Sequence, residues 1–582
     1  MYPNNFEAYH PRDNVKHIHH FSIPEHANIP GRVTINDLPS ELLLNIIRYI
    51  PDSINSGEGH VVWPIQEDFP RYNSRSLLQL ALCSHYFHEL TDPILYERFH
   101  HGTKTSTKGF LLFLKRILSR PDLGRSVRIF HMDGTEAPGL GVIIEEDYED
   151  KYSTYKEDYD GYYDSDFDLS CFTAEDLKDV RKKIAEASTT TLECYEWAMA
   201  VEKGDLNALI APILTLTPNL QVLDIDMWTR PDSVPPILTR MLAQAGQLQR
   251  ERRLGHQFAL WGLNKVMVRC YHALDVDDVI HHLTALLTIP SVEILCAIHE
   301  DGAENYYYDF PETNVNEEDL EAMLQGNSLG LANIKELSLS IIPISLSALL
   351  QLWCYYPNLK KFSYRDSLED GELIGNDALQ LEEVKDINLM AKASHMNPQL
   401  QDLAIFHRGF FWSSILTSSI SSLATFKCLR HLETTWPIFT CCGDINEEMD
   451  LPLSQNIVDA IPLSLEQLGI FGGPYQTKDH HDLALAVIFK LLQQKYRLPA
   501  LNTLDFGWKR GRHLDITIPD HVLCHEGFTE EDYLESMGRC QGAGVELILK
   551  PVEQPHPGYI SFRVDDDGNT AASGFATRMG VI

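Results

Sequence analysis

The first strong hydrophobic pattern in this sequence is LPSELLLNIIRYIP, at residues 38 to 51. Four apolar residues in it recur at intervals of three and four, the spacing of one helix face: Leu43, Ile46, Ile47 and Ile50. Further leucines lie outside this face, so the predicted helix is apolar around most of its circumference. Pro39 suits the first turn of a helix, and Pro51 ends it. A helix this short and this apolar must bury its surface against other elements.

Two shorter apolar patterns follow, SLLQLALCSHYFHEL at residues 76 to 90 and DPILYERF at residues 92 to 99. The first predicts a second helix, with one face made of Leu77, Leu80, Ala81, Ser84 and Phe87. Pro93 is expected to open a third helical turn, which carries Leu95, Tyr96 and Phe99. Three short helices cannot hide this much apolar surface between themselves, so the sequence predicts that a partner covers it.

This ordered set, L-P-x-E-L-L at the start and P-x-L-Y at the end, resembles the F-box. The resemblance implies that the three helices bind the Skp-type adaptor of a cullin ubiquitin ligase. It implies adaptor contacts at Leu38, Pro39, Leu42, Leu43, Ile46, Ile47, Leu77, Leu80, Pro93, Leu95 and Tyr96. One departure is that F-boxes usually pass almost directly from the first helix to the next, whereas here residues 52 to 75 intervene as a turn-rich insertion. The alternative is an ordinary helical hairpin within a larger helical core.

A second pattern recurs nine times from about residue 210 onward, as in NLQVLDIDM (219 to 227) and NIKELSLS (333 to 340). Counted from the first apolar residue, positions 1, 4 and usually 6 are apolar, and such alternation predicts a strand with one buried face. The nine first positions are residues 220, 263, 292, 334, 359, 400, 429, 465 and 501. Helical stretches such as SLSALLQLWCYY separate them, so the pattern predicts one strand and one helix every 25 to 43 residues.

The L-x-x-L-x-L signature resembles leucine-rich repeats, which implies an α/β solenoid with parallel strands. Neither the strand nor the helix of a repeat is stable alone, so stacking has to supply the core. The long units depart from the family, as do Trp228, Ile342, Arg408, Pro437 and Lys509, which stand where such repeats usually carry Asn or Cys. We therefore expect an irregular α/β solenoid, with a plain α/β domain of parallel strands as the alternative. Together, the two patterns resemble the F-box/leucine-rich-repeat substrate receptors, most of all their divergent fungal members.

In a stacked solenoid, positions 3, 5 and 7 of each strand share one face of the sheet. This face is predicted to mix charge with a few aromatic residues, a composition suited to binding a protein. The candidate target-binding residues are Arg365, Phe406, Glu433 and Phe471.

The net charge of −35 argues against nucleic acid or an anionic membrane as the main partner, since both require a basic surface. The eleven cysteines form no C-x-x-C pair, the N-terminus lacks a secretory signal, and no apolar run is long enough to span a membrane. We therefore expect an intracellular protein, in the cytoplasm, the nucleus or both.

The expected organisation is a flexible leader at 1–34, the F-box at 35–100, the solenoid at 101–550 and a tail at 551–582. An acidic, tyrosine-rich stretch within 136–170 is expected to be an insertion in the solenoid.

Motifs of enzyme chemistry are missing from the sequence: there is no P-loop, nucleophile elbow, H-E-x-x-H or dinucleotide fingerprint. The run Asp164, Asp166, Asp168 resembles a calcium loop, but Leu169 stands where its sharp turn needs glycine. We therefore predict no catalytic residue, metal or cofactor. The predicted function is a non-catalytic substrate receptor of a Skp–cullin–F-box ligase. The alternatives are a scaffold that uses the same modules outside degradation and an enzyme whose site cannot be recognised.

Overall fold

The structure is a computed structural model. It describes residues 38–48, 74–101, 107–132, 169–228, 237–252, 260–271, 283–300, 333–340, 352–365, 394–395, 397–406, 423–435, 458, 461–471, 489, 491–509, 538–552, 562–564 and 570–572. Two compact units divide these residues: the first runs to Asp226 and includes 260–263, and the second holds the rest.

The first unit begins with three helices and continues into the first strands of a sheet. Its elements are α1 (Ser40–Arg48), α2 (Ser74–Cys83), α3 (His85–Leu95), β1 (Arg98–His101), α4 (Thr107–Ser119), α5 (Pro121–Ser126), β2 (Ile129–Met132), η5 (Leu169–Cys171), α6 (Ala174–Ala187), α7 (Thr191–Glu202), α8 (Leu206–Leu216) and β3 (Val222–Trp228). The last two residues of β3 belong to the second unit.

The segment from 76 to 99 folds differently from the prediction. Ser84 separates α2 from α3, because its hydroxyl accepts a hydrogen bond from the N–H of Phe87 and so caps the start of α3. Pro93 lies inside α3 and opens no third helix, and Phe99 belongs to β1. The predicted single helix from 76 to 90 is therefore wrong, as is the helical turn assigned to Phe99.

The second unit continues the same sheet with one strand after another. Its elements are α9 (Ile237–Arg250), β4 (Lys265–Tyr271), β5 (Ile294–Glu300), β6 (Glu336–Ser340), β7 (Lys361–Arg365), β8 (Asp402–Phe406), β9 (His431–Thr435), β10 (Gln467–Phe471), η9 (Lys495–Arg497), β11 (Thr503–Lys509), β12 (Glu546–Val552) and the antiparallel pair β13 (Phe562–Val564) and β14 (Thr570–Ala572).

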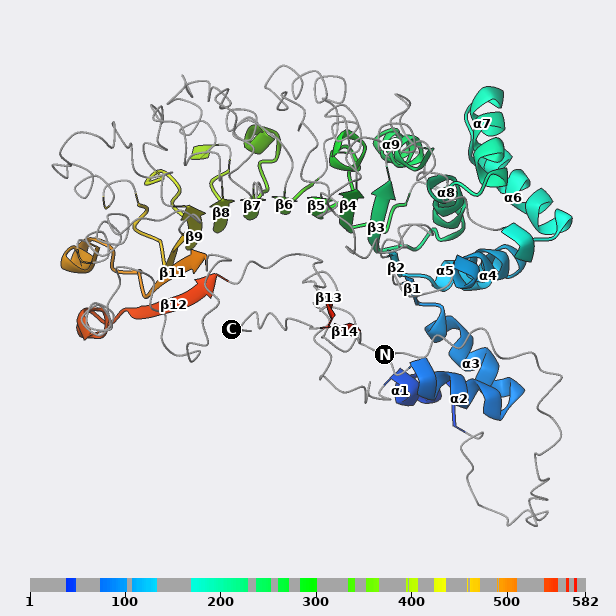
Figure 1. The fold of residues 1–582 in the computed structure, drawn as a ribbon, viewed down its shortest axis with the longest axis horizontal. Helices are drawn as coiled ribbons and strands as arrows, with labels where there is room; N and C mark the ends of the chain where they lie inside the picture. The colour runs from blue at the N-terminus through cyan, green and yellow to red at the C-terminus, as the bar shows by residue number, and fades with distance from the viewer. Residues whose placement is uncertain are drawn as a thin grey trace, which may run out of the picture. The chain divides into compact units, whose positions relative to one another are not determined.

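The twelve strands β1 to β12 form one all-parallel sheet in which each strand lies beside its neighbour in the sequence (Figure 1). The nine predicted strands are β3 to β11, and their expected parallel, sequential order is confirmed. β1 and β2 at one end and β12 at the other extend the sheet beyond the predicted nine. The protein is thus an α/β fold whose strand order is compatible with a solenoid.

A recurring turn leads into most of the strands. The residues at position 1 are all buried, and most donate their N–H to the carbonyl three residues earlier, over 2.9 to 3.3 Å: Leu220, Leu263, Val292, Leu359, Leu400, Leu429, Leu465 and Leu501. Each such turn reverses the chain and sets the next strand parallel to the last. Positions 4 and 6 of the strands follow into the core, as in Leu337 and Leu339 of β6.

Polar side chains link successive turns by hydrogen bonds. Leucine-rich repeats usually have an Asn or Cys after the strand, and this sequence has no consistent Asn or Cys there. The ties come instead from residues before the strand. Asn219 Nδ2 donates to the carbonyl of Arg125 (2.7 Å), Asn397 Nδ2 to that of Trp353 (2.6 Å) and Ser464 Oγ to that of Leu429 (2.7 Å). Each bond reaches the turn of the preceding strand, so it links two neighbouring repeats.

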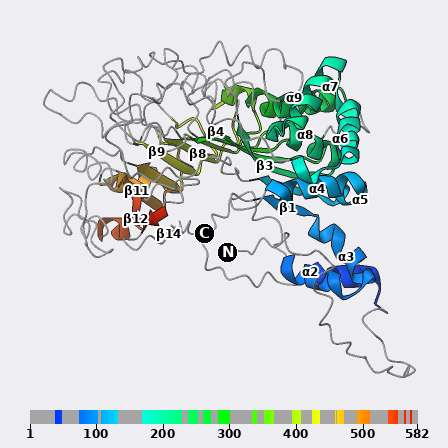
Figure 2. The ribbon, with the colours of Figure 1, turned by 45° about the vertical axis from the view of Figure 1, so that its right-hand side comes forward.

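Helices α6 to α8 follow one another in the part of the sequence between β2 and β3 and belong to the first unit (Figure 2). α8 is buried at every residue after Leu206, and Trp197 of α7 donates its Nε1–H to the Ala208 carbonyl over 2.8 Å. This hydrogen bond holds α7 against α8. Earlier in the chain, α6 begins at a capping box in which Thr173 and Asp176 satisfy each other's backbone N–H.

The predicted leader at 1–34 lies outside the described residues, as do 52–73 of the predicted insertion and 136–168 of the acidic stretch. Within the predicted tail, 551–582, the described residues are the end of β12 and the β13–β14 pair.

Candidate functional site

The three helices α1, α2 and α3 have a small hydrophobic core of their own. Ile47, Leu77 and Ile94 form it, with Leu44, Leu80, Leu90 and Leu95 packed at its edge. Leu43 is also buried. Three of the predicted adaptor contacts, Leu43, Ile47 and Leu77, therefore lie in the interior of the three helices.

A second set of apolar side chains faces outward from the same helices. Leu42 and Ile46 lie one turn apart on α1, and each is 51% exposed. Leu78 and Leu82 lie one turn apart on α2 and are 47% and 65% exposed, and Tyr86 at the start of α3 is 37% exposed. Single exposed apolar residues are ordinary, but two pairs on such short helices are uncommon. We call these five residues the outer apolar face.

Sequence analysis identified Leu42 and Ile46 of this face but missed Leu78, Leu82 and Tyr86. The signal was available, because Leu78 and Leu82 are spaced by four residues on a face of α2 turned about 100° from the buried Leu77 and Ala81.

The remaining predicted adaptor residues lie at the ends of helices. Leu38 is half-buried, whereas Pro39 is exposed and its carbonyl accepts the N–H groups of Leu42 and Leu43, which starts α1. Pro93 is exposed on α3. Tyr96 faces inward: its ring stacks on Phe113 of α4, with 6.0 Å between centroids. The ring of Tyr96 thus contacts α4.

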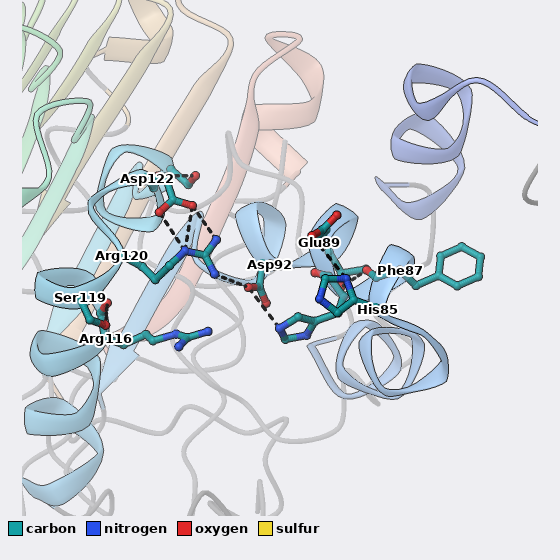
Figure 3. A network of polar contacts seen from close by, with 11 residues as sticks. His85, Phe87, Glu89, Asp92, Arg116, Ser119, Arg120 and Asp122 are labelled. Atoms are coloured by element: carbon teal, nitrogen blue, oxygen red, sulfur yellow. Dashed lines mark hydrogen bonds and ion pairs between the residues drawn. The ribbon is translucent and has the colours of Figure 1, made fainter.

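A polar contact connects α3 to α4, α5 and β2 (residues 107–132), which we call the first repeat. The carboxylate of Asp92, 6% exposed, lies 3.6 Å from the Arg120 guanidinium and 3.5 Å from Nε2 of His88 (Figure 3). Arg120 stands between α4 and α5 and also pairs with Asp122 over 2.6 Å. The Arg120 guanidinium and the His88 imidazole therefore approach a carboxylate that is almost entirely removed from water.

The predicted target-binding residues lie on four strands of the second unit. Glu433 is half-buried on β9, opposite Ala404 and Gly469 of the neighbouring strands. Arg365 and Phe406 are opposite each other on β7 and β8, and Phe471 ends β10. The side chains of these last three lie outside what the structure describes.

Charged residues at positions 2 and 3 of the repeats pair with one another across neighbouring repeats. Lys335 bonds Glu293 over 2.7 Å, Lys361 lies 3.8 Å from Glu336, and His431 bonds Asp402. Because each pair sets a basic side chain against a carboxylate, the described part of this face is polar and mixed in charge.

The described part of the chain contains no cluster of three or more His, Cys, Asp or Glu side chains able to hold a metal ion. Among the same residues, no helix combines the length and apolar character needed to cross a membrane. The feature that most resembles a binding site is therefore the outer apolar face.

No protein-family model matches this chain and no curated protein matches it, so its function has to be inferred from its own residues.

Proposed function

We propose that this protein is a non-catalytic substrate receptor of a Skp–cullin–F-box ubiquitin ligase. In this proposal α1 to α3 bind a Skp-type adaptor, and the parallel sheet binds a target protein. The cullin would be reached through the adaptor, and the protein would act in the cytoplasm, the nucleus or both. Its contribution would be proximity, since holding a target lysine near a charged conjugating enzyme makes a bimolecular encounter local.

The observation that carries the proposal is the outer apolar face. The three helices already have a core, so Leu42, Ile46, Leu78 and Leu82 are not needed outside to complete it. Side chains of this kind contribute about 1 kcal/mol each when their remaining exposed half is buried by a partner. The L-P-x-E-L-L sequence around Leu42 adds the resemblance to the F-box.

The test is binding of the full chain to a purified Skp-type adaptor, measured by calorimetry or pull-down. A Leu42→Ser, Ile46→Ser variant should bind more than tenfold more weakly, because it removes about 2 kcal/mol of apolar contact. The fold should be retained, since both side chains are half exposed.

The matched control is Leu192→Ser, Tyr195→Ser on α7, where the two side chains are 67% and 64% exposed. This variant loses a similar exposed apolar pair away from α1 and should bind the adaptor as the parent does. Unchanged adaptor binding by a folded Leu42→Ser, Ile46→Ser variant would refute the proposal.

A further inference from the structure

The Asp92 carboxylate lies where α3 meets Arg120, the residue between α4 and α5. It belongs to the last turn of α3, and its side chain is 6% exposed. Its Oδ2 lies 3.6 Å from Nη1 of Arg120 and 3.5 Å from Nε2 of His88. A charge removed from water is costly unless a counter-charge faces it, so Asp92 depends on these neighbours.

Arg120 is fixed in place by its own surroundings. Its backbone N–H donates to the Arg116 carbonyl at the end of α4, and its carbonyl accepts from Leu123 of α5. Its Nε and Nη2 both bond the Asp122 carboxylate, over 2.9 and 2.6 Å. This fork leaves Nη1 on the side of Asp92, as Figure 3 shows. Arg120 thus directs Nη1 of its guanidinium toward Asp92 of α3.

Aromatic packing supports the same corner. Tyr96, which follows α3, stacks on Phe113 of α4, and Phe99 of β1 stacks on the same ring with 4.0 Å between centroids. The Asp92–Arg120 contact is an ion pair without a hydrogen bond. It adds a constraint of its own, because a carboxylate removed from water needs its counter-charge close by and only some orientations of α3 keep the two groups together.

We infer that the Asp92–Arg120 pair fixes the orientation of α1 to α3 relative to the first repeat, with both acting as positioning residues. The orientation itself does not depend on any partner. Its consequence rests on the proposed function: an adaptor on α1 and α2 would be held at one angle to the first repeat. A fixed angle maintains the geometry in which a bound target lysine can be reached.

The test measures the distance between the two parts in the full chain. Fluorophores are introduced through noncanonical amino acids at Gln79 on α2 and Lys108 on α4, both exposed positions. Single-molecule energy transfer should give one narrow distance distribution for the parent. Arg120→Ala and Asp92→Asn should each broaden it. Asp92→Asn keeps the size of the side chain and serves as the test where Arg120→Ala does not fold.

The control is Arg181→Ala, which removes an exposed ion pair with Glu202 between α6 and α7 (2.6 Å). It should leave the distribution unchanged. A narrow, parent-like distribution in folded Asp92→Asn overturns the inference, and so does equal broadening by Arg181→Ala.

Adaptor binding separates this inference from the proposed function. The Asp92→Asn variant should bind the adaptor within twofold of the parent, since the outer apolar face is untouched. A large loss of binding would mean that Asp92 shapes the docking surface itself, which contradicts a purely positioning role. Failure of the parent to bind any adaptor would refute the proposed function, while the distance distributions would still decide the inference.

Discussion

The ring nitrogen Nδ1 of His131 lies 2.5 Å from a carboxylate oxygen of Asp224, directly across the boundary between β2 and β3. The two side chains are 5% and 2% exposed, and the ring of His100 on β1 stacks on that of His131. The same type of cross-strand pair occurs between Asp402 and His431 on β8 and β9, but there the side chains are 27% and 47% exposed. One sheet thus contains a buried and an exposed version of the same interaction.

The first prediction compares these two pairs. His131→Ala should lower the free energy of unfolding by roughly 3–5 kcal/mol, the usual cost of removing one partner of a buried pair. His431→Ala should cost about 0–1 kcal/mol, because water and salt screen an exposed pair. Urea unfolding followed by circular dichroism measures both. Equal losses in the two variants would show that burial does not govern the strength of these pairs.

The second prediction separates the core of the three helices from their outer apolar face. Ile47→Ala should destabilise the helices by about 2–5 kcal/mol, because the side chain is 2% exposed and leaves a cavity. Leu42→Ala should change stability by about 0.5 kcal/mol or less, because half of its side chain is already in water. Hydrogen exchange of α1 and α3 amides is the measurement, and a larger effect of Leu42→Ala would contradict the assignment of inner and outer faces.

The sequence was sufficient to predict the strands, for a specific physical reason. A parallel strand with one buried face repeats its apolar residues every second position, as Leu337 and Leu339 do, and the turn before it buries one more, Ile334. Nine segments with this spacing fit parallel strands, either in a solenoid or in a plain α/β domain. The order of the sheet then followed from the short distance between successive units.

The helical N-terminus was harder to predict because single polar contacts decide its details. Ser84 looked like part of an apolar helix face, yet its hydroxyl caps α3 and divides the segment in two. Periodicity also cannot show which apolar face is inside when a helix is apolar nearly all round. Ile46 was therefore placed on the same predicted face as Leu43, although Leu43 is buried and Ile46 is half exposed. The pairing of Asp92 with Arg120 depends on tertiary packing and has no signal in the local sequence.

The third prediction concerns pH and Asp176 at the start of α6. Burial acts to raise the pKa of this carboxyl, but hydrogen bonds from Lys115, 2.7 Å away, and from Thr173 outweigh it, so the pKa lies below its ordinary value. A carboxyl with a lowered pKa in the folded state stabilises the fold above its unfolded pKa of about 3.9. That stabilisation is lost as the pH falls below about 4 and then through the lowered pKa that Asp176 has in the folded protein.

Asp176→Asn should therefore melt at a lower temperature than the parent at pH 7, and the difference should shrink as the pH falls below about 4. Thermal unfolding at a series of pH values measures this. Glu175→Gln is the control, because Glu175 is an exposed neighbour in the same first turn. A difference between Asp176→Asn and the parent that persists undiminished at low pH would count against a charge-based role.

The last prediction concerns the contact between α5, the helix before β2, and α8, the helix before β3. Gly124 of α5 lies so close to α8 that a Cβ atom there would stand 2.5 Å from the Leu216 carbonyl oxygen. The obstacle is backbone at the end of a buried helix, so it cannot move aside as a flexible side chain could. Gly124→Ala should therefore destabilise the first unit by about 1–3 kcal/mol through overpacking.

Gly109 of α4 is the matched control, because a Cβ there meets nothing within 4 Å. Gly109→Ala should be neutral or stabilise the protein by up to about 1 kcal/mol, since alanine loses less conformational freedom in a helix. Thermal unfolding of the two variants checks both signs, and a stable Gly124→Ala protein would mean that α5 and α8 are not packed this closely.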